Sequence, residues 1–129
     1  MGVVNIYTCD LLNINTTFNN VVITASSQAI QIPNARNFVF NYRLQSSGTP
    51  TSIKFTFEFA KVGVDVWYAL DEQFFARLEH EGTEVAGTGK RFCVTGPCVG
   101  ERIRVTVDST GTTALNTFTL SEAHISFKD

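Results

Sequence analysis

Apolar and polar side chains alternate with a period of two along the middle third of the chain. That period places alternate residues on opposite faces of a β-strand. The pattern predicts strands over residues 38–44, 52–60 and 64–70, with a turn at Lys61, Val62 and Gly63. The apolar members, which should face a common core, are Phe38, Phe40, Tyr42, Leu44, Ile53, Phe55, Phe57, Phe59, Val64, Val66, Tyr68 and Leu70.

The flanking segments carry shorter versions of the same pattern. They predict strands near residues 3–9, 21–24, 29–32, 91–94, 98–107 and 115–127, separated by clusters of Asn, Ser, Thr, Gly and Pro. Within the last segment the apolar face shifts by one residue between Leu120 and Ala123. A β-bulge near Ser121 and Glu122, or a bend between two strands, accounts for that shift.

About eight short strands and little helix predict an all-β fold, a single-domain antiparallel β-sandwich of jelly-roll type. A length of 129 residues suits one domain. We expect residues 1–20 to form a candidate N-terminal arm, with 10–20 read as a loop. Residues 71–91 form an irregular segment with a short helix over 72–79, because Phe74, Phe75 and Leu78 follow a near-helical spacing.

The composition argues against nucleic-acid binding, membrane insertion and secretion. A net charge of −2 and a pI near 5.6 provide no basic field for nucleic acid. No apolar run is long enough to span a membrane, and the N-terminal residues lack the pattern of a secretion signal. Only 17% of residues are charged and 11 are Phe, which suits either a Phe-rich core or a surface that neighbouring molecules cover.

No catalytic or cofactor pattern is present, so we expect a protein that is not an enzyme. Gly87–Lys90 reads GTGK, but Glu84 stands where a phosphate-binding loop needs Gly and Arg91 where it needs Ser or Thr. No nucleophile motif or zinc-ligand spacing appears. His80 and His124 are both expected to be solvated polar residues, and His80 is kept as a candidate contact.

Cys93 and Cys98 flank a predicted turn at Thr95, Gly96 and Pro97. Across a tight hairpin their Cα atoms would lie within disulfide range, about 4.4–6.8 Å. The pair is therefore a candidate disulfide, and the alternative is two free thiols. With three cysteines in the chain, at least one is unpaired within it.

Trp67 falls on the polar side of its predicted strand, opposite Val66 and Tyr68. An aromatic ring there can stack on a sugar, contact another subunit, or lie beneath the chain's own Phe74 or Phe75. Arg102 and Arg104 share an outward face and are expected to pair with acids on a neighbouring strand or subunit. The candidate interface or ligand contacts are Trp67, Tyr68, Phe74, Phe75, His80, Arg102 and Arg104.

Two stretches, VDVWYALDEQFF and GERIRVTVDSTGTTALNTFTLSEAHISF, make the chain resemble the small β-sandwich decoration proteins of tailed-phage capsids. The resemblance covers roughly residues 20–129 in style. It implies a non-enzymatic virion structural protein that cements the shell, forms a homo-oligomer, and binds the major capsid protein or other virion proteins. Residues 1–20 and 81–91 would carry those contacts, and the protein would be located in the virion.

The alternative is a carbohydrate-binding jelly-roll module or an adhesion domain. Trp67, Tyr68 and Phe74 would then stack on sugar rings. Fold class alone does not decide between these functions, because β-sandwiches host many of them.

Overall fold

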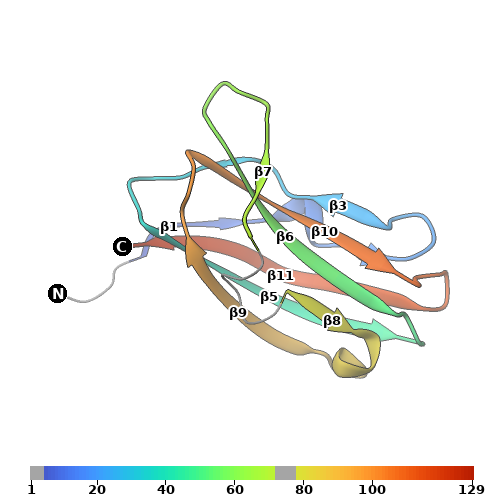
Figure 1. Ribbon diagram of the computed structural model, residues 1–129. Helices are drawn as coiled ribbons and strands as arrows, with labels where there is room; N and C mark the ends of the chain where they lie inside the picture. The colour runs from blue at the N-terminus through green and yellow to red at the C-terminus, as the bar shows by residue number, and fades with distance from the viewer. Residues whose placement is uncertain (1–4, 72–77) are drawn as a thin grey trace.

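Two antiparallel β-sheets pack face to face in the computed structural model, which describes residues 5–71 and 78–129 (Figure 1). In the first sheet the strand order is β1-β11-β5-β9, with β2 also paired to β11. Its strands are β1 (Asn5–Asp10), β2 (Thr17–Phe18), β5 (Asn37–Ser47), β9 (Lys90–Pro97) and β11 (Thr117–Lys128).

In the second sheet the order is β3-β10-β6-β7, with β4 paired to β10 and β8 to β6. Its strands are β3 (Thr24–Ser26), β4 (Ile30–Gln31), β6 (Ser52–Ala60), β7 (Tyr68–Ala69), β8 (Glu79–Glu81) and β10 (Arg102–Thr110). Two 3₁₀ turns, η1 (Leu12–Ile14) and η3 (Gly82–Val85), complete the described elements. Apart from the consecutive pair β6 and β7, the strands paired along each sheet are distant in sequence, and this jelly-roll sandwich confirms the predicted fold class.

The period of two sets the core, as the sequence predicts. Along β5 and β6 buried and half-buried residues alternate, and every predicted Phe of these strands lies inside. Ile103, Val105 and Val107 of β10 are likewise buried. Phe38 and Phe40 of one sheet meet Phe57 of the other at ring-centroid distances of 4.7 and 5.5 Å. These contacts join the two layers.

The predicted strand over 64–70 is wrong in extent, because only Tyr68 and Ala69 pair with β6. Residues 61–67 instead form a loop that projects from one end of the sandwich (Figure 1). Val64, Val66 and Tyr68 are 44%, 50% and 71% exposed rather than buried. Leu70, the last residue of this alternation, is buried in the core as predicted, whereas the described residues of the opposite sheet do not cover Val64, Val66 and Tyr68.

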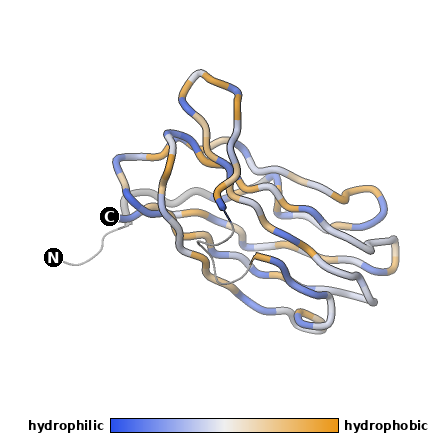
Figure 2. The backbone as a smooth tube through the Cα atoms, in the orientation of Figure 1, coloured by the Kyte–Doolittle hydropathy of each residue, from blue (hydrophilic) through white to orange (hydrophobic). Residues whose placement is uncertain are grey.

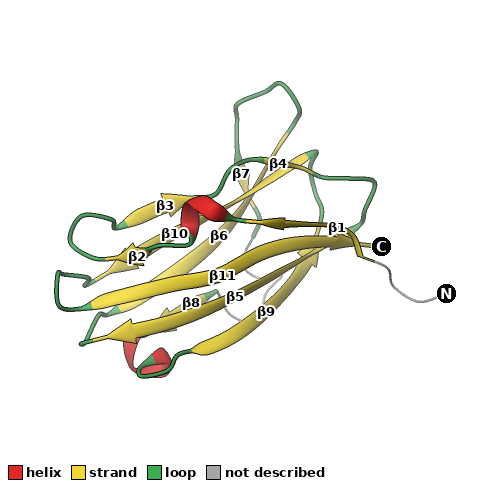
Figure 3. Cartoon of the chain, turned by 180° about the vertical axis from the view of Figure 1, so that it is seen from behind, coloured by secondary structure: helices red, strands yellow, loops and turns green. Residues whose placement is uncertain are grey.

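The N-terminal segment belongs to the sandwich from residue 5 onward rather than forming an arm. β1 and β2 both pair with β11, and η1 lies between them (Figure 3). Leu11, Ile14 and Phe18 are fully buried. These three core residues were not predicted, because they lie in an Asn- and Thr-rich stretch and their spacing fits neither a strand nor a helix.

The segment predicted to be irregular contains short but regular structure. β8 pairs with β6, and η3 carries a capping box between Glu81 and Glu84. The helix predicted over 72–79 falls mostly on 72–77, outside the described residues. Where the chain is described, none of its helical turns has the length and apolar character needed to cross a membrane.

Candidate functional site

A groove with a volume of about 340 Å³ lies on the sheet of β5, β9 and β11. We call it the polar groove. It is lined by Asn41, Tyr42, Arg91, Phe92, Glu122 and His124. The strand register brings these residues together from three strands, because His124 of β11 pairs with Asn41 of β5, and Asn41 pairs with Cys93 of β9. Cross-strand partners on one face lie close enough to contact one ligand together.

Glu122 sits in the groove on a distorted backbone. The register of β11 against β5 shifts between Ser121 and His124, which confirms the predicted bulge. Glu122 has φ 55°, and it is the one non-glycine with positive φ in residues 5–71 and 78–129. A left-handed Glu costs on the order of 1 kcal/mol and persists only where its surroundings hold it. Such strain is often associated with function.

Two arginines hold the Glu122 carboxylate over the groove. Arg91 Nη2 donates to both carboxylate oxygens, at 3.3 and 3.2 Å, and Arg43 Nε lies 3.9 Å away. These ion pairs are exposed, so each contributes little to stability, about 0–1 kcal/mol. Their effect is to fix the direction of the carboxylate.

The groove offers hydrogen-bond donors and acceptors side by side. His124 Nδ1 lies 3.1 Å from the Glu122 carbonyl oxygen, which can only accept, so in the neutral ring Nε2 is left as an acceptor. The Asn41 side chain makes no hydrogen bond with any described residue. Its amide therefore presents a donor and an acceptor to solvent. This mixed set suits hydroxyl groups, which both donate and accept.

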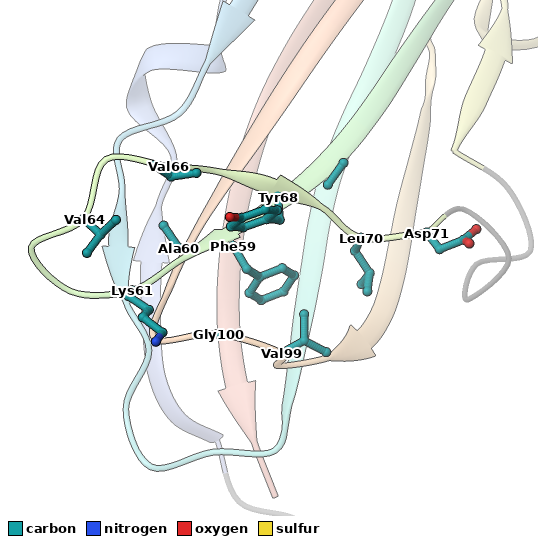
Figure 4. Close-up of a pocket in the computed structure, with 11 residues that line it drawn as sticks. Phe59, Ala60, Lys61, Val64, Val66, Tyr68, Leu70, Asp71, Val99 and Gly100 are labelled. Atoms are coloured by element: carbon teal, nitrogen blue, oxygen red, sulfur yellow. The ribbon is translucent and has the colours of Figure 1, made fainter.

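A second cavity, which we call the apolar end pocket, opens beside the projecting loop and has a volume of about 600 Å³ (Figure 4). Val64, Val66 and Tyr68 come from the loop and β7, whereas Val99 and Gly100 come from the turn after β9. Phe59 and Leu70 lie between these two walls. Lys61 and Asp71 are the charged residues that line it. The lining therefore favours an apolar group over a sugar hydroxyl.

Trp67 faces away from this pocket and lies against the two arginines singled out in the sequence. The guanidinium carbons of Arg102 and Arg104 are 5.0 and 4.4 Å from the centroid of its ring. Arg102 Nε also donates to the carbonyl of Lys61 at 3.1 Å. Cation–π contacts of this kind contribute about 0.5–1 kcal/mol each at exposed sites. Trp67 and Arg102 thus tie the projecting loop to β10, and the indole face is already occupied.

Arg104 pairs with an acid on the neighbouring strand, as predicted. Its Nε donates to Glu58 Oε1 at 3.1 Å, and Thr106 donates to the same carboxylate. Burial raises the pKa of Glu58. Hydrogen bonds from Arg104 and Thr106, with the charge of Arg104, outweigh it and hold the pKa below its ordinary value of 4.5.

Because folding lowers the pKa of Glu58, its carboxylate stabilises the fold above the unfolded pKa of 4.5, and this contribution is lost as pH falls through the lower folded value. We expect Glu58→Gln to lower the free energy of unfolding by about 1 kcal/mol at neutral pH. The difference should shrink towards zero in acid below the folded pKa. Urea titrations across pH measure it, and a constant difference at all pH values would contradict the assignment.

His80 corrects the expectation of a solvated side chain and cannot be a surface contact, because it is 2% exposed. Its Nε2 lies 2.7 Å from the Tyr42 hydroxyl, and its Nδ1 lies 3.2 Å from Glu84 Oε2. The ring centroid lies 4.2 Å from that of Phe92. Glu79, His80 and Glu81 do alternate in burial, but His does not register as apolar in a sequence pattern.

The candidate disulfide between Cys93 and Cys98 is wrong, since both thiols are free. The residues predicted as a hairpin turn, 95–97, continue β9 against β5, and the chain turns later, at 98–101. Five residues along one extended run separate the Cα atoms by roughly 16 Å, far beyond disulfide range. Burial raises the pKa of Cys98 to about 11.

The two thiols should therefore react at different rates. Cys93 is exposed, whereas Cys98 is half-buried with a pKa of about 11. Thiolate is the reactive species, so at about pH 8 we expect Cys98 to react on the order of a hundredfold more slowly than an ordinary exposed cysteine. Peptide mapping after timed alkylation measures both rates. Equal rates, or a Cys93–Cys98 crosslinked peptide, would contradict the structure.

The sequence candidates do not gather at one place. Tyr68 lines the apolar end pocket, Trp67, Arg102 and Arg104 lie on the outer side of the second sheet, and Phe74 and Phe75 fall outside the described residues. None of them lines the polar groove. Sequence reasoning missed Asn41, Arg91 and Glu122 as site residues. The one signal that pointed there was the shift of apolar face at Ser121 and Glu122.

No known protein-family profile matches the chain. No curated protein matches it either. Solved structures do resemble it. A carbohydrate-binding module of family CBM4 superposes with a TM-score of 0.55 at 14% identity, over 92% of this chain and 66% of that one.

Two further carbohydrate-binding modules are similar. The CBM22-1–GH10 modules of the Clostridium thermocellum xylanase Xyn10B, complexed with xylohexaose, give a TM-score of 0.56 at 12% identity, over 99% of this chain and 26% of that one. The C-terminal CBM6 of the Zobellia galactanivorans laminarinase LamC gives 0.50 at 12%, over 97% and 99%. The chain thus spans less than two thirds of the first two structures. At these identities the likeness establishes the fold alone.

Proposed function

We propose that this protein is a non-catalytic carbohydrate-binding domain and that the polar groove is its ligand site. The observation that carries the proposal is the mixed set of hydrogen-bonding groups held open in the groove by the Glu122 bulge. Vicinal sugar hydroxyls both donate and accept, so they match a carboxylate beside a guanidinium, an amide and an imidazole acceptor. Similarity in fold to carbohydrate-binding modules supports the same proposal.

The groove binds through polar groups and offers no exposed aromatic face. Tyr42 and Phe92 belong to its lining, but Tyr42 is 3% exposed, and the two rings stack on the core side of the sheet at a centroid distance of 5.2 Å. A sugar in the groove would therefore be held by hydrogen bonds to the polar side chains. A neutral oligosaccharide matches this lining best, because Glu122 and Arg91, its two charged residues, carry opposite signs and pair with each other.

Glycan binding tests the proposal. We expect the wild-type protein to bind members of an immobilised glycan array, and Glu122→Gln and His124→Ala each to weaken the affinity about tenfold or more, the usual effect of losing hydrogen bonds to charged or fixed polar groups. Gln keeps the size of Glu122 and its backbone geometry. Asp129→Asn is the matched control, an acid-to-amide change at the exposed C-terminal residue, and should leave binding unchanged.

Isothermal titration with the best array ligand measures these affinities. Tyr68→Ala should also leave glycan binding unchanged, because Tyr68 lines the apolar end pocket rather than the polar groove. An array without hits, or affinities that Glu122→Gln and His124→Ala do not alter, would remove the proposal. Loss of binding in Tyr68→Ala alone would move the site to the other pocket.

A virion structural role, as a decoration protein bound to the major capsid protein, is the second candidate. The exposed valines of the projecting loop favour it, since apolar patches at a surface mark contacts with other proteins. Sedimentation with purified capsid shells tests it. Val64→Asp should abolish co-sedimentation while Glu122→Gln preserves it, and an absence of wild-type protein from the shell fraction would eliminate this role.

A further inference from the structure

Exposed large apolar side chains gather at the two ends of the sandwich. Among the side chains that the structure describes, those of residues 10–11, 13–71 and 78–129, five lie at the end where β6 finishes and β10 begins: Val62, Val64, Val66, Tyr68 and Val99. Three lie at the opposite end: Val21, Ile23 and Leu115. We call these three the apolar tip. In Figure 2 hydrophobic colour marks the projecting loop at the top and a loop at the right-hand end of the sandwich.

The two ends differ in shape. The first end contains the apolar end pocket, with a volume of about 600 Å³. The second end carries protruding side chains, because Val21 is 81% and Leu115 83% exposed. A cavity of that size accommodates a few aliphatic side chains. The same chain thus carries a concave pocket at one end and a protruding apolar tip at the other.

Hydrogen bonds hold the apolar tip rigid. Asn19 Oδ1 accepts from the backbone N–H groups of Val21 and Val22 at 2.8 and 3.0 Å. Thr113 Oγ1 accepts from the N–H of Leu115 at 3.3 Å. The turns also support each other, since Thr112 Oγ1 donates to the Asn19 carbonyl at 3.1 Å. Leu115 is thus presented on a preordered turn, which lowers the entropy lost on binding.

The loops that carry the apolar tip contain no charge. Residues 16–23, 47–51 and 109–117 contain no Asp, Glu, Lys or Arg, although Glu81 and Glu84 of the neighbouring η3 segment lie at the same end. The centres of protein interfaces are depleted in charge, because burying an unpaired ion is costly. The pocket is charged only at Lys61 and Asp71, which carry opposite signs. An uncharged apolar tip can enter this pocket without burying an unpaired charge of its own.

We propose that the chain associates with itself head to tail, with the apolar tip of one copy seated in the apolar end pocket of the next. Because the contact joins two different surfaces, it is heterologous and continues into a ring or filament rather than stopping at a dimer. The small area at each end predicts a weak contact, so assembly should appear only at high protein concentration. This inference goes beyond carbohydrate binding and needs no ligand.

Sedimentation velocity over increasing concentration, to about 1 mM, under reducing conditions tests the proposal on the whole chain. The wild-type average mass should rise continuously with concentration. Leu115→Asp removes the tip, and Val64→Asp removes the pocket wall, so each alone should stay monomeric. Both positions are exposed, so unchanged thermal unfolding shows that the variants are folded. Cys93→Asp, an added charge on the exposed middle of β9, is the control and should assemble like the wild type.

A mixture of the two variants gives the sharpest result. Leu115→Asp retains a working pocket and Val64→Asp a working tip, so the equimolar mixture should form a one-to-one dimer and grow no further. A wild-type protein that stays monomeric at every concentration overturns the proposal. So does assembly of either single variant, or a mixture without dimers. Because no glycan is present, these outcomes are independent of the test of carbohydrate binding.

Discussion

Phe40→Ala is expected to lower the free energy of unfolding by about 3–5 kcal/mol, a large part of the 5–15 kcal/mol typical of a domain. Phe40 is fully buried at the centre of the core. Its ring centroid lies 4.8 Å from Tyr42 in the same strand and 5.8 and 5.5 Å from Phe55 and Phe57 of the facing sheet. Removing the ring opens a cavity between the two layers, and neighbouring rings cannot close it without leaving their own contacts.

Equilibrium denaturation in urea measures this loss, and thermal unfolding should shift downward by about 10–20 °C. Phe40→Leu is the matched control within the core and should cost only about 1–1.5 kcal/mol, since most of the volume is retained. Val39→Ala, one residue away on the outer face, should have a smaller effect still. If Phe40→Ala lost less than about 1 kcal/mol, the ring could not be packed as the structure places it.

The core could be predicted because it depends on a local pattern. A period of two along β5 and β6 assigns Phe38, Phe40, Phe55 and Phe57 to one face whatever the rest of the chain does. The same rule applied to residues 64–70 predicts that their apolar side chains share one face, but not whether another part of the chain packs against that face. Whether Val64 and Tyr68 are buried depends on how far the opposite sheet extends, which no local pattern records.

The polar groove could not be predicted for a related reason. Asn41, Arg91 and His124 come from three strands far apart in sequence, and only the register of β5 with β9 and β11 brings them together. The bulge at Glu122 was visible because it interrupts a local alternation. Its consequence, an acid held in a groove by arginines of two other strands, depends on the strand order.

His80→Ala is expected to destabilise the protein by about 2–4 kcal/mol, although His80 lies between two glutamates and looks like a surface residue in the sequence. β8 belongs to the second sheet and Tyr42 to the first, so the 2.7 Å contact between His80 Nε2 and the Tyr42 hydroxyl links the layers. Glu84 fixes the other side of the ring at 3.2 Å. Losing the ring removes both polar contacts and the packing against Phe92.

His80→Phe separates these contributions, because it keeps an aromatic ring and removes both hydrogen bonds. We expect it to cost about 1–3 kcal/mol, less than Ala. Combined with Tyr42→Phe it forms a double-mutant cycle, and a coupling energy of about 1 kcal/mol would assign that part of the loss to the Tyr42–His80 hydrogen bond. Urea denaturation of the four proteins supplies the cycle. If both His80 variants were as stable as the wild type, His80 would have to be exposed, as its sequence context suggests. That result would contradict the pairing of β8 with β6.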